Sequence, residues 1–118
     1  MTKKRTNELL HTIIYGIQEK KGKEILSLDF SNIENAELKY FVICEGDSTT
    51  HVAAIADSVI ETVSKQKVGK IYGKEGYKNS EWIILDYSDI FVHIFQPHIR
   101  KHYNIEELWA DCFIQEYN

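Results

Sequence analysis

Residues 82–95 contain two largely hydrophobic runs, both rich in β-branched and aromatic residues, which flank the pair Ser88-Asp89. This pattern predicts a β-hairpin, because Ser and Asp favour turns and the flanking residues favour strands. Alternate residues of a strand point to the same side of its sheet. One side of the hairpin is then almost wholly apolar, and we expect it to face the core: Ile83, Leu85, Tyr87, Ile90, Val92 and Ile94.

The opposite face of this hairpin combines polar groups with large apolar ones. Its expected members are Trp82, Ile84, Asp86, Phe91, His93 and Phe95. Asp86 should lie opposite Phe91 and diagonal to His93. A hydrophobic surface with a few polar groups favours a binding face. Alternatively, helices cover this face, and Asp86 and His93 form an internal hydrogen-bonded pair. A register slip of one residue would exchange the two faces.

Two longer segments place hydrophobic residues at helical spacing. The first is expected to start at Thr6 as its N-cap and to end around residues 20–22. The second follows Ser48 and should end near Gly69, since glycine often follows a helix C-terminus. Its hydrophobic positions fit one helical face throughout: Val52, Ile55, Ala56, Val59, Ile60 and Val63.

Shorter segments complete the expected fold. The remaining strands are expected at residues 23–30, 39–44 and 71–72, followed by a loop over residues 73–79. Pro97 suits the start of a short helix through Tyr103, and Asn104 with Glu107 resembles the capping box of a final helix. The apolar stripe of that final helix would be Ile105, Leu108, Trp109, Cys112 and Phe113.

These elements predict a single α/β domain over residues 1–118. Because the hairpin strands are antiparallel while other strands alternate with helices, the sheet should be mixed and packed with helices. The two cysteines, Cys44 and Cys112, show no CxxC spacing and are expected to be buried free thiols. The sequence has no secretory signal pattern and no segment of membrane-spanning length, so we expect a cytoplasmic protein that does not associate with membranes.

The net charge of −4 argues against a dedicated nucleic-acid-binding protein, because such proteins neutralise phosphates with Lys and Arg. Direct RNA binding is therefore disfavoured, and we expect no sequence-specific nucleic-acid partner. The same acidity is compatible with docking onto a basic protein, since opposite charges accelerate association. Of the two tryptophans, Trp109 fits the apolar stripe of its helix and is expected in the core. Trp82 is therefore the better candidate for an interface anchor.

The sequence GDSTTH at residues 46–51 leads from a strand into a helix, whose free N–H groups could hold an anion. The segment lacks the P-loop lysine, and Asp47 would repel a phosphate, so a capped helix start with Gly46 easing the turn is favoured. The only candidate ligands for a catalytic Mg²⁺, Asp86 and Asp89, point in different directions. Nucleotidyl transfer is therefore disfavoured.

Three histidines, His93, His98 and His102, could in principle bind a metal ion. The sequence lacks the glutamate of an HExxH motif, and no fixed fourth ligand is visible nearby, so surface histidines are the favoured interpretation. We expect no metal, no cofactor and no catalytic residues.

Several of these residues together resemble the Iojap-related ribosomal silencing factor family, called RsfS. The resemblance rests on WIILDYSDIFVHIF at residues 82–95 and on a GxSxxH-like stretch formed by Gly46, Ser48 and His51. Downstream, the matching residues are Arg100, Tyr103, Glu106, Leu108 and Trp109. The similarity extends from about Thr6 to Trp109.

This resemblance implies a non-enzymatic translation repressor that acts under nutrient limitation. Such a protein binds the fourteenth protein of the large ribosomal subunit and blocks joining of the small subunit. The implied fold is nucleotidyltransferase-like without the catalytic carboxylates. The family's binding face carries over to Trp82, and less directly to Asp86 and His93.

Phe91 and Phe95 lie on the same hairpin face and complete the candidate partner-binding set, whereas Gly46, Ser48, His51, Arg100 and Tyr103 match the family without an assigned role. The tail at residues 110–118 could dock on the core or mediate self-association, which leaves a homodimer possible. The rival hypothesis is a nucleotide-binding or nucleotidyl-transferring enzyme, motivated by the GDSTTH segment and the implied fold.

Overall fold

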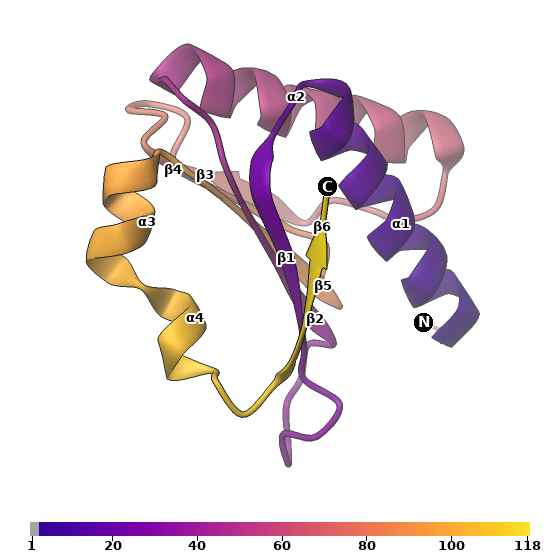
Figure 1. The fold of residues 1–118 in the computed structure, drawn as a ribbon. Helices are drawn as coiled ribbons and strands as arrows, with labels where there is room; N and C mark the ends of the chain where they lie inside the picture. Colours follow the sequence, from indigo (N-terminus) through magenta and orange to yellow (C-terminus); the bar gives the residue numbers. More distant parts are fainter. Residues whose placement is uncertain (1–2) are drawn as a thin grey trace.

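The computed structural model describes residues 3–118, which form a mixed six-stranded sheet with helices on both faces (Figure 1). The helices are α1 (Lys3–Glu19), α2 (Thr49–Gln66), α3 (Pro97–Tyr103) and α4 (Ile105–Leu108). The strands are β1 (Lys23–Asp29), β2 (Tyr40–Glu45), β3 (Gly73–Glu75), β4 (Trp82–Asp86), β5 (Ile90–Phe95) and β6 (Phe113–Tyr117). They lie in the order β3-β4-β5-β2-β1-β6, and β2 runs parallel to β5 while the other neighbours are antiparallel. The predicted mixed α/β fold is confirmed.

The hairpin formed by β4 and β5 has the predicted register. Trp82 lies opposite Phe95, and Asp86 lies opposite Phe91. Ser88 adopts a positive φ of 71°, which the tight turn requires. The six residues of the predicted core face are all buried, with exposed fractions between 0 and 1%. The position of the turn and the alternating direction of side chains along each strand therefore predicted correctly which side of the hairpin faces the core.

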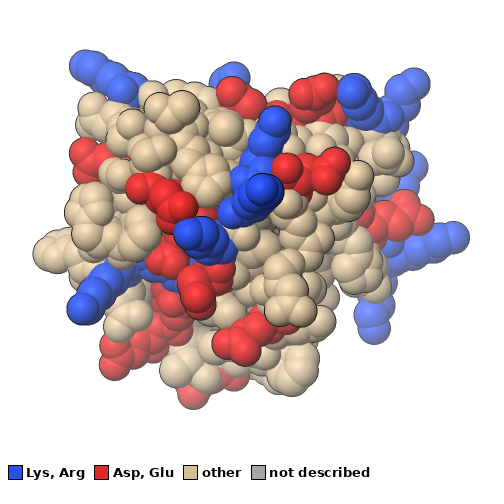
Figure 2. All heavy atoms as spheres, turned by 45° about the horizontal axis from the view of Figure 1, so that its top comes forward, with Lys and Arg blue, Asp and Glu red and all other residues tan. Residues whose placement is uncertain are grey.

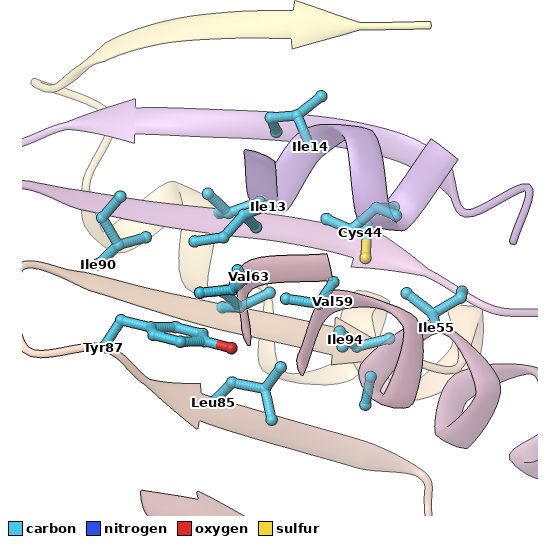
Figure 3. Packing of buried hydrophobic residues seen from close by; sticks show 14 of the residues in the cluster. Ile13, Ile14, Cys44, Ile55, Val59, Val63, Leu85, Tyr87, Ile90 and Ile94 are labelled. Atoms are coloured by element: carbon cyan, nitrogen blue, oxygen red, sulfur yellow. The ribbon is translucent and has the colours of Figure 1, made fainter. Parts of the chain in front are cut away.

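Helices α1 and α2 cover this core face (Figure 1). In Figure 3, side chains of both helices, including Ile13, Ile55 and Val59, point toward residues of the sheet such as Leu85 and Ile94. The two helices also pack closely against each other, and the Ser58 hydroxyl of α2 donates a hydrogen bond of 2.8 Å to the Gly16 carbonyl of α1. The main hydrophobic core thus lies between the sheet and this helix pair.

A second, smaller hydrophobic cluster lies on the opposite face of the sheet, where α3 and α4 cross it (Figure 1). Its buried members are Leu28, Phe30, Ile43, Phe95 and Cys112. The Trp109 ring packs edge-on against Phe30, with 5.1 Å between ring centroids. Trp109 therefore contributes to a core, as predicted, and both cysteines are buried and free.

The predicted final helix is too long. Helix α4 ends at Leu108, and Cys112 and Phe113 lie outside it. Residues 113–117 form β6, which pairs antiparallel with β1 from Phe113 opposite Asp29 to Tyr117 opposite Ile25. The helical spacing of the apolar residues was misleading because Phe113, Ile114 and Tyr117 also favour strands, and β1 offered an unpaired edge. The tail thus docks on the body of the protein.

Three smaller expectations at the ends of elements were also wrong. The short strand comprises residues 73–75 rather than 71–72, because Ile71 packs against the core outside the strand ladder. Thr6 lies inside α1, and its hydroxyl donates to Asp89 at 3.2 Å rather than capping the helix. Helix α2 ends at Gln66, before Gly69, and its C-cap residue is Lys67, which adopts the left-handed conformation with φ 55°.

Candidate functional site

The indole of Trp82 is held in a fixed orientation on the second face of the sheet. Its Nε1–H donates a hydrogen bond of 3.2 Å to Nδ1 of His93. Its ring stacks on Phe95 with 4.8 Å between centroids and an interplanar angle of 26°. The Tyr103 ring contacts it from α3 at a centroid distance of 5.0 Å. Trp82 remains only half-buried among these neighbours, so part of its indole is accessible to a partner.

His93 lies beneath this tryptophan and is only 6% exposed. Because Nδ1 accepts from Trp82, the proton of the neutral ring is on Nε2, and that atom is buried without a hydrogen-bond partner. Burial lowers the pKa of His93 to about 4, since desolvation disfavours the charged ring. Asp86 bonds instead to the backbone N–H of Ser88 at 2.7 Å, so the alternative Asp86–His93 pair is not formed.

The other candidate residues on this face differ in their access to solvent. Asp86 and Phe91 are half-buried at its surface, and Tyr103 is 53% exposed. Phe95 is fully buried under the Trp82 ring. In this arrangement Phe95 and His93 support the indole from below, whereas Asp86 and Phe91 can contact a partner directly.

A shallow pocket of about 220 Å³ opens beside the indole. Trp82, Ile99 and Tyr103 form its apolar wall. The turn after β3 contributes Gly76 and Lys78 to its polar rim. A half-buried aromatic ring next to an apolar recess is typical of a surface that receives side chains of another protein.

The backbone of Gly76 lies against the start of β4, the strand that carries Trp82, and leaves no room for a side chain. Its φ is +96°, and a Cβ added there would lie 2.0 Å from the Trp82 carbonyl oxygen. We therefore expect Gly76→Ala to lower the free energy of unfolding by about 1–3 kcal/mol, because the backbone must shift or remain strained. Gly73→Ala is the matched control, since a Cβ at Gly73 meets nothing within 4 Å. Equal urea midpoints for the two variants would contradict this assignment.

Arg100 is buried and bonded to acidic and carbonyl groups, which the sequence motif did not indicate. It is 8% exposed, and its Nη1 donates to the Glu24 carbonyl at 2.7 Å and lies 3.5 Å from the Glu45 carboxylate. Its Nε donates to Glu106 at 3.2 Å. Burial raises the pKa of Glu45, although the Arg100 charge opposes that shift. This buried cluster ties α3 to β1 and β2, and thereby fixes the helix that ends at Tyr103.

Hydrogen bonds of the GxSxxH-like motif connect the segment after β2 to the start of α2 and to the end of α1. The Ser48 hydroxyl caps α2 by accepting from the His51 N–H at 3.0 Å. His51 accepts from the Asp47 N–H through Nδ1 at 2.8 Å, so its Nε2–H donates to the Lys20 carbonyl at the end of α1 at 2.7 Å. A Cβ at Gly46 would lie 2.8 Å from the Val52 nitrogen. The motif is thus engaged in internal contacts, which favours the capped helix start over an anion site.

The candidate metal and catalytic residues are not brought together. His98 and His102 are exposed on α3, while His93 is buried in β5. Asp89 accepts a hydrogen bond from Thr6 of α1, whereas Asp86 accepts one from the Ser88 N–H, so the two carboxylates have different partners. Within residues 3–118, no group of three or more His, Cys, Asp or Glu residues could hold a metal ion. None of the helices in that range is long and apolar enough to cross a membrane.

Two features of the site could not be inferred from sequence patterns. The contact between Tyr103 and Trp82 joins α3 to β4, and the bond between Trp82 and His93 replaces the expected Asp86–His93 pair. For the buried cluster around Arg100, the only signal in the sequence was an arginine within a short helix rich in polar residues. An arginine that becomes buried needs carboxylate or carbonyl partners. These features define a small mixed α/β protein whose polar motif residues hold the fold and whose second sheet face carries a partly exposed cluster of aromatic residues.

Comparisons with known proteins identify the family. The family model described as "Ribosomal silencing factor during starvation" matches residues 3–118. "Ribosomal silencing factor RsfS" of Halalkalibacterium halodurans is 33% identical over 89% of this chain and 88% of its own length. A crystal structure of a protein from Chromobacterium violaceum superposes with a TM-score of 0.82 at 34% identity, covering 88% of this chain and 85% of that one.

A shorter match is "Mitochondrial assembly of ribosomal large subunit protein 1" of Mus musculus, 31% identical over 60% of this chain and 32% of that protein. The chain belongs to the ribosomal silencing factor family, RsfS, which confirms the resemblance seen in the sequence.

Proposed function

We propose that this protein binds the large ribosomal subunit through its fourteenth protein and sterically prevents the small subunit from joining. Translation would thereby be repressed when nutrients are limiting. Membership of the ribosomal silencing factor family supports this proposal, as does the large ribosomal subunit named in the mouse relative. The ribosomal partner also implies that the protein acts in the cytoplasm.

The observation that carries this proposal is the orientation of Trp82. An indole fixed by a hydrogen bond and a ring stack loses little conformational freedom on binding, so more of its contact energy appears as affinity. Such aromatic anchors dominate the energetics of many interfaces. The half-buried Asp86 and Phe91 lie on the same sheet face, four residues along their strands from Trp82 and Phe95, and Tyr103 borders the adjoining pocket.

No catalytic step is needed for this activity. A rigid body that buries about 800 Å² of its surface on the joining side of the large subunit would make the two subunits mutually exclusive ligands. We therefore propose a non-enzymatic factor. A nucleotide-binding enzyme remains the rival, and saturable heat on titration of the protein with nucleoside triphosphate and Mg²⁺ would favour that rival.

Truncation of the anchor tests the proposed surface. Trp82→Ala should weaken binding to isolated large subunits by about 2 kcal/mol, or about thirtyfold in Kd, because a buried interface indole is lost. Binding is measured by cosedimentation, and subunit joining by light scattering with purified subunits.

Tyr15→Ala is a suitable control, because Tyr15 is a 55% exposed aromatic residue on α1, across the sheet from Trp82. Circular dichroism would establish that both variants fold. Unchanged cosedimentation of a folded Trp82→Ala variant would refute the proposed contact surface.

A further inference from the structure

One segment of this acidic protein is rich in lysines and has tyrosines among them. Residues 65–78 contain five lysines and one glutamate, whereas the whole chain has a net charge of −4. The lysines are Lys65, Lys67, Lys70, Lys74 and Lys78, and the aromatic residues among them are Tyr72 and Tyr77. Basic residues interleaved with aromatic ones are typical of surfaces that bind nucleic acid without sequence specificity.

The fold joins this segment to the start of α1. A groove of about 910 Å³ is lined by Arg5 of α1, by Lys67 and Lys70 after α2, and by Tyr72. The same groove includes the carboxylates of Glu8 and Asp89, so its lining carries three positive and two negative side chains. Figure 2 shows several Lys and Arg side chains, with Asp and Glu side chains among them, at its right-hand edge, where Figure 1 places the start of α1 and the end of α2.

The basic and aromatic side chains at the start of β3 are exposed to solvent. Lys70, Tyr72 and Lys74 are two residues apart, within β3 or just before it, and all three are exposed. The Lys70 ammonium lies 5.3 Å from the centre of the Tyr72 ring, and Lys74 lies 5.2 Å from the centre of the Tyr77 ring. Tyr72 is 62% exposed, so a partner can reach the part of its ring that the Lys70 ammonium does not cover.

We propose that this basic edge, defined as Arg5, Lys67, Lys70, Tyr72, Lys74 and Lys78, contacts the phosphate backbone of ribosomal RNA. The inference rests on the proposed function, because it assigns a second contact to the same docked protein. A row of ammonium groups beside an exposed aromatic ring matches a polynucleotide, which offers regularly spaced phosphates and unpaired bases that stack. An acidic protein would satisfy the charges but would leave the position of Tyr72 without a role.

The basic edge adjoins the proposed protein-binding surface. Strand β3 pairs with β4, which carries Trp82, and Lys78 lines the pocket beside that indole. A ribosomal protein bound at Trp82 would therefore leave the basic edge at the rim of the contact, where charged groups mainly affect the association rate. Binding to the subunit should consequently weaken as the salt concentration rises, because phosphate contacts release counterions.

The double variant Lys70→Gln/Lys74→Gln tests this proposal. We expect its affinity for large subunits to fall about tenfold at low salt, and the slope of log Kd against log salt to fall by about 1–2, as for the loss of one or two phosphate contacts. Affinity for the isolated fourteenth protein should not change. Lys20→Gln/Lys21→Gln is the matched control, because it removes the same charge from exposed positions just after α1, away from the groove.

The outcomes separate this inference from the proposed function. Normal affinity and normal salt slope of the Lys70→Gln/Lys74→Gln variant for large subunits would overturn the RNA contact. Equal weakening toward the isolated ribosomal protein would also overturn it, because the lysines would then contact protein. Failure of the unmodified protein to bind large subunits would instead refute the proposed function itself.

Discussion

Replacement of Arg100 with alanine is expected to lower the free energy of unfolding by about 3–5 kcal/mol, the cost of removing one partner from a buried ion pair. Arg100 contacts the carboxylates of Glu45 and Glu106 and the carbonyl of Glu24. Its loss leaves two partly buried negative charges without their counterion, and it releases α3 from the sheet. Urea unfolding followed by tryptophan fluorescence measures the effect.

Lys101→Ala is the control for this variant, because Lys101 is the neighbouring exposed residue of the same helix. A second substitution tests the electrostatic origin of the loss. Adding Glu45→Gln to Arg100→Ala should recover part of the stability, since one uncompensated charge is removed. If Arg100→Ala unfolds at the same urea concentration as Lys101→Ala, the buried cluster contributes no stability and the interpretation fails.

Acidification is expected to destabilise the protein through His93. The folded-state pKa of this residue is about 4, whereas the ordinary value is 6.5. As the pH falls, His93 of the unfolded chain therefore takes up a proton before His93 of the folded protein does. This proton uptake stabilises the unfolded state relative to the folded state. The contribution of His93 to stability is complete above pH 6.5, declines as the pH falls, and is reduced by about 3 kcal/mol near pH 4.

The difference in unfolding free energy between the unmodified protein and His93→Gln isolates this contribution from other titrating groups. Glutamine keeps an acceptor for the Trp82 N–H but does not titrate. We expect this difference to be largest at pH 7 and to shrink toward pH 4. A difference that stays constant over this range would mean that His93 is protonated equally in the folded and unfolded states.

These two predictions concern the groups that hold the proposed binding surface in place. His93 orients Trp82 through a hydrogen bond, and Arg100 anchors the helix whose last residue, Tyr103, contacts the same indole. Neither group needs to touch a partner to affect binding. Variants at these positions should therefore be compared at equal folded fractions before their affinity for ribosomal subunits is interpreted.

The elements of the protein were predictable to different degrees. The hairpin and α2 were predicted well because a strong local pattern agreed with the tertiary structure. Strand β6 was missed because its residues suit a helix stripe and a strand equally, and only the free edge of β1 decided between them. Ile71 was mistaken for a strand residue because a single β-branched apolar residue fits a strand as well as a core contact, and in the structure it packs against the main core before β3 begins.

The sequence by itself determined the family, the mixed α/β class and the face of the hairpin that carries Trp82, because these depend on motifs and on alternation over neighbouring residues. The tertiary structure alone decided which polar groups on that face are buried and what they bind. It placed His93 under the indole and Arg100 among carboxylates from distant parts of the chain. Hydrogen bonds and ion pairs of this kind join residues that no sequence spacing relates, since their distances are set by the packing of whole helices and strands.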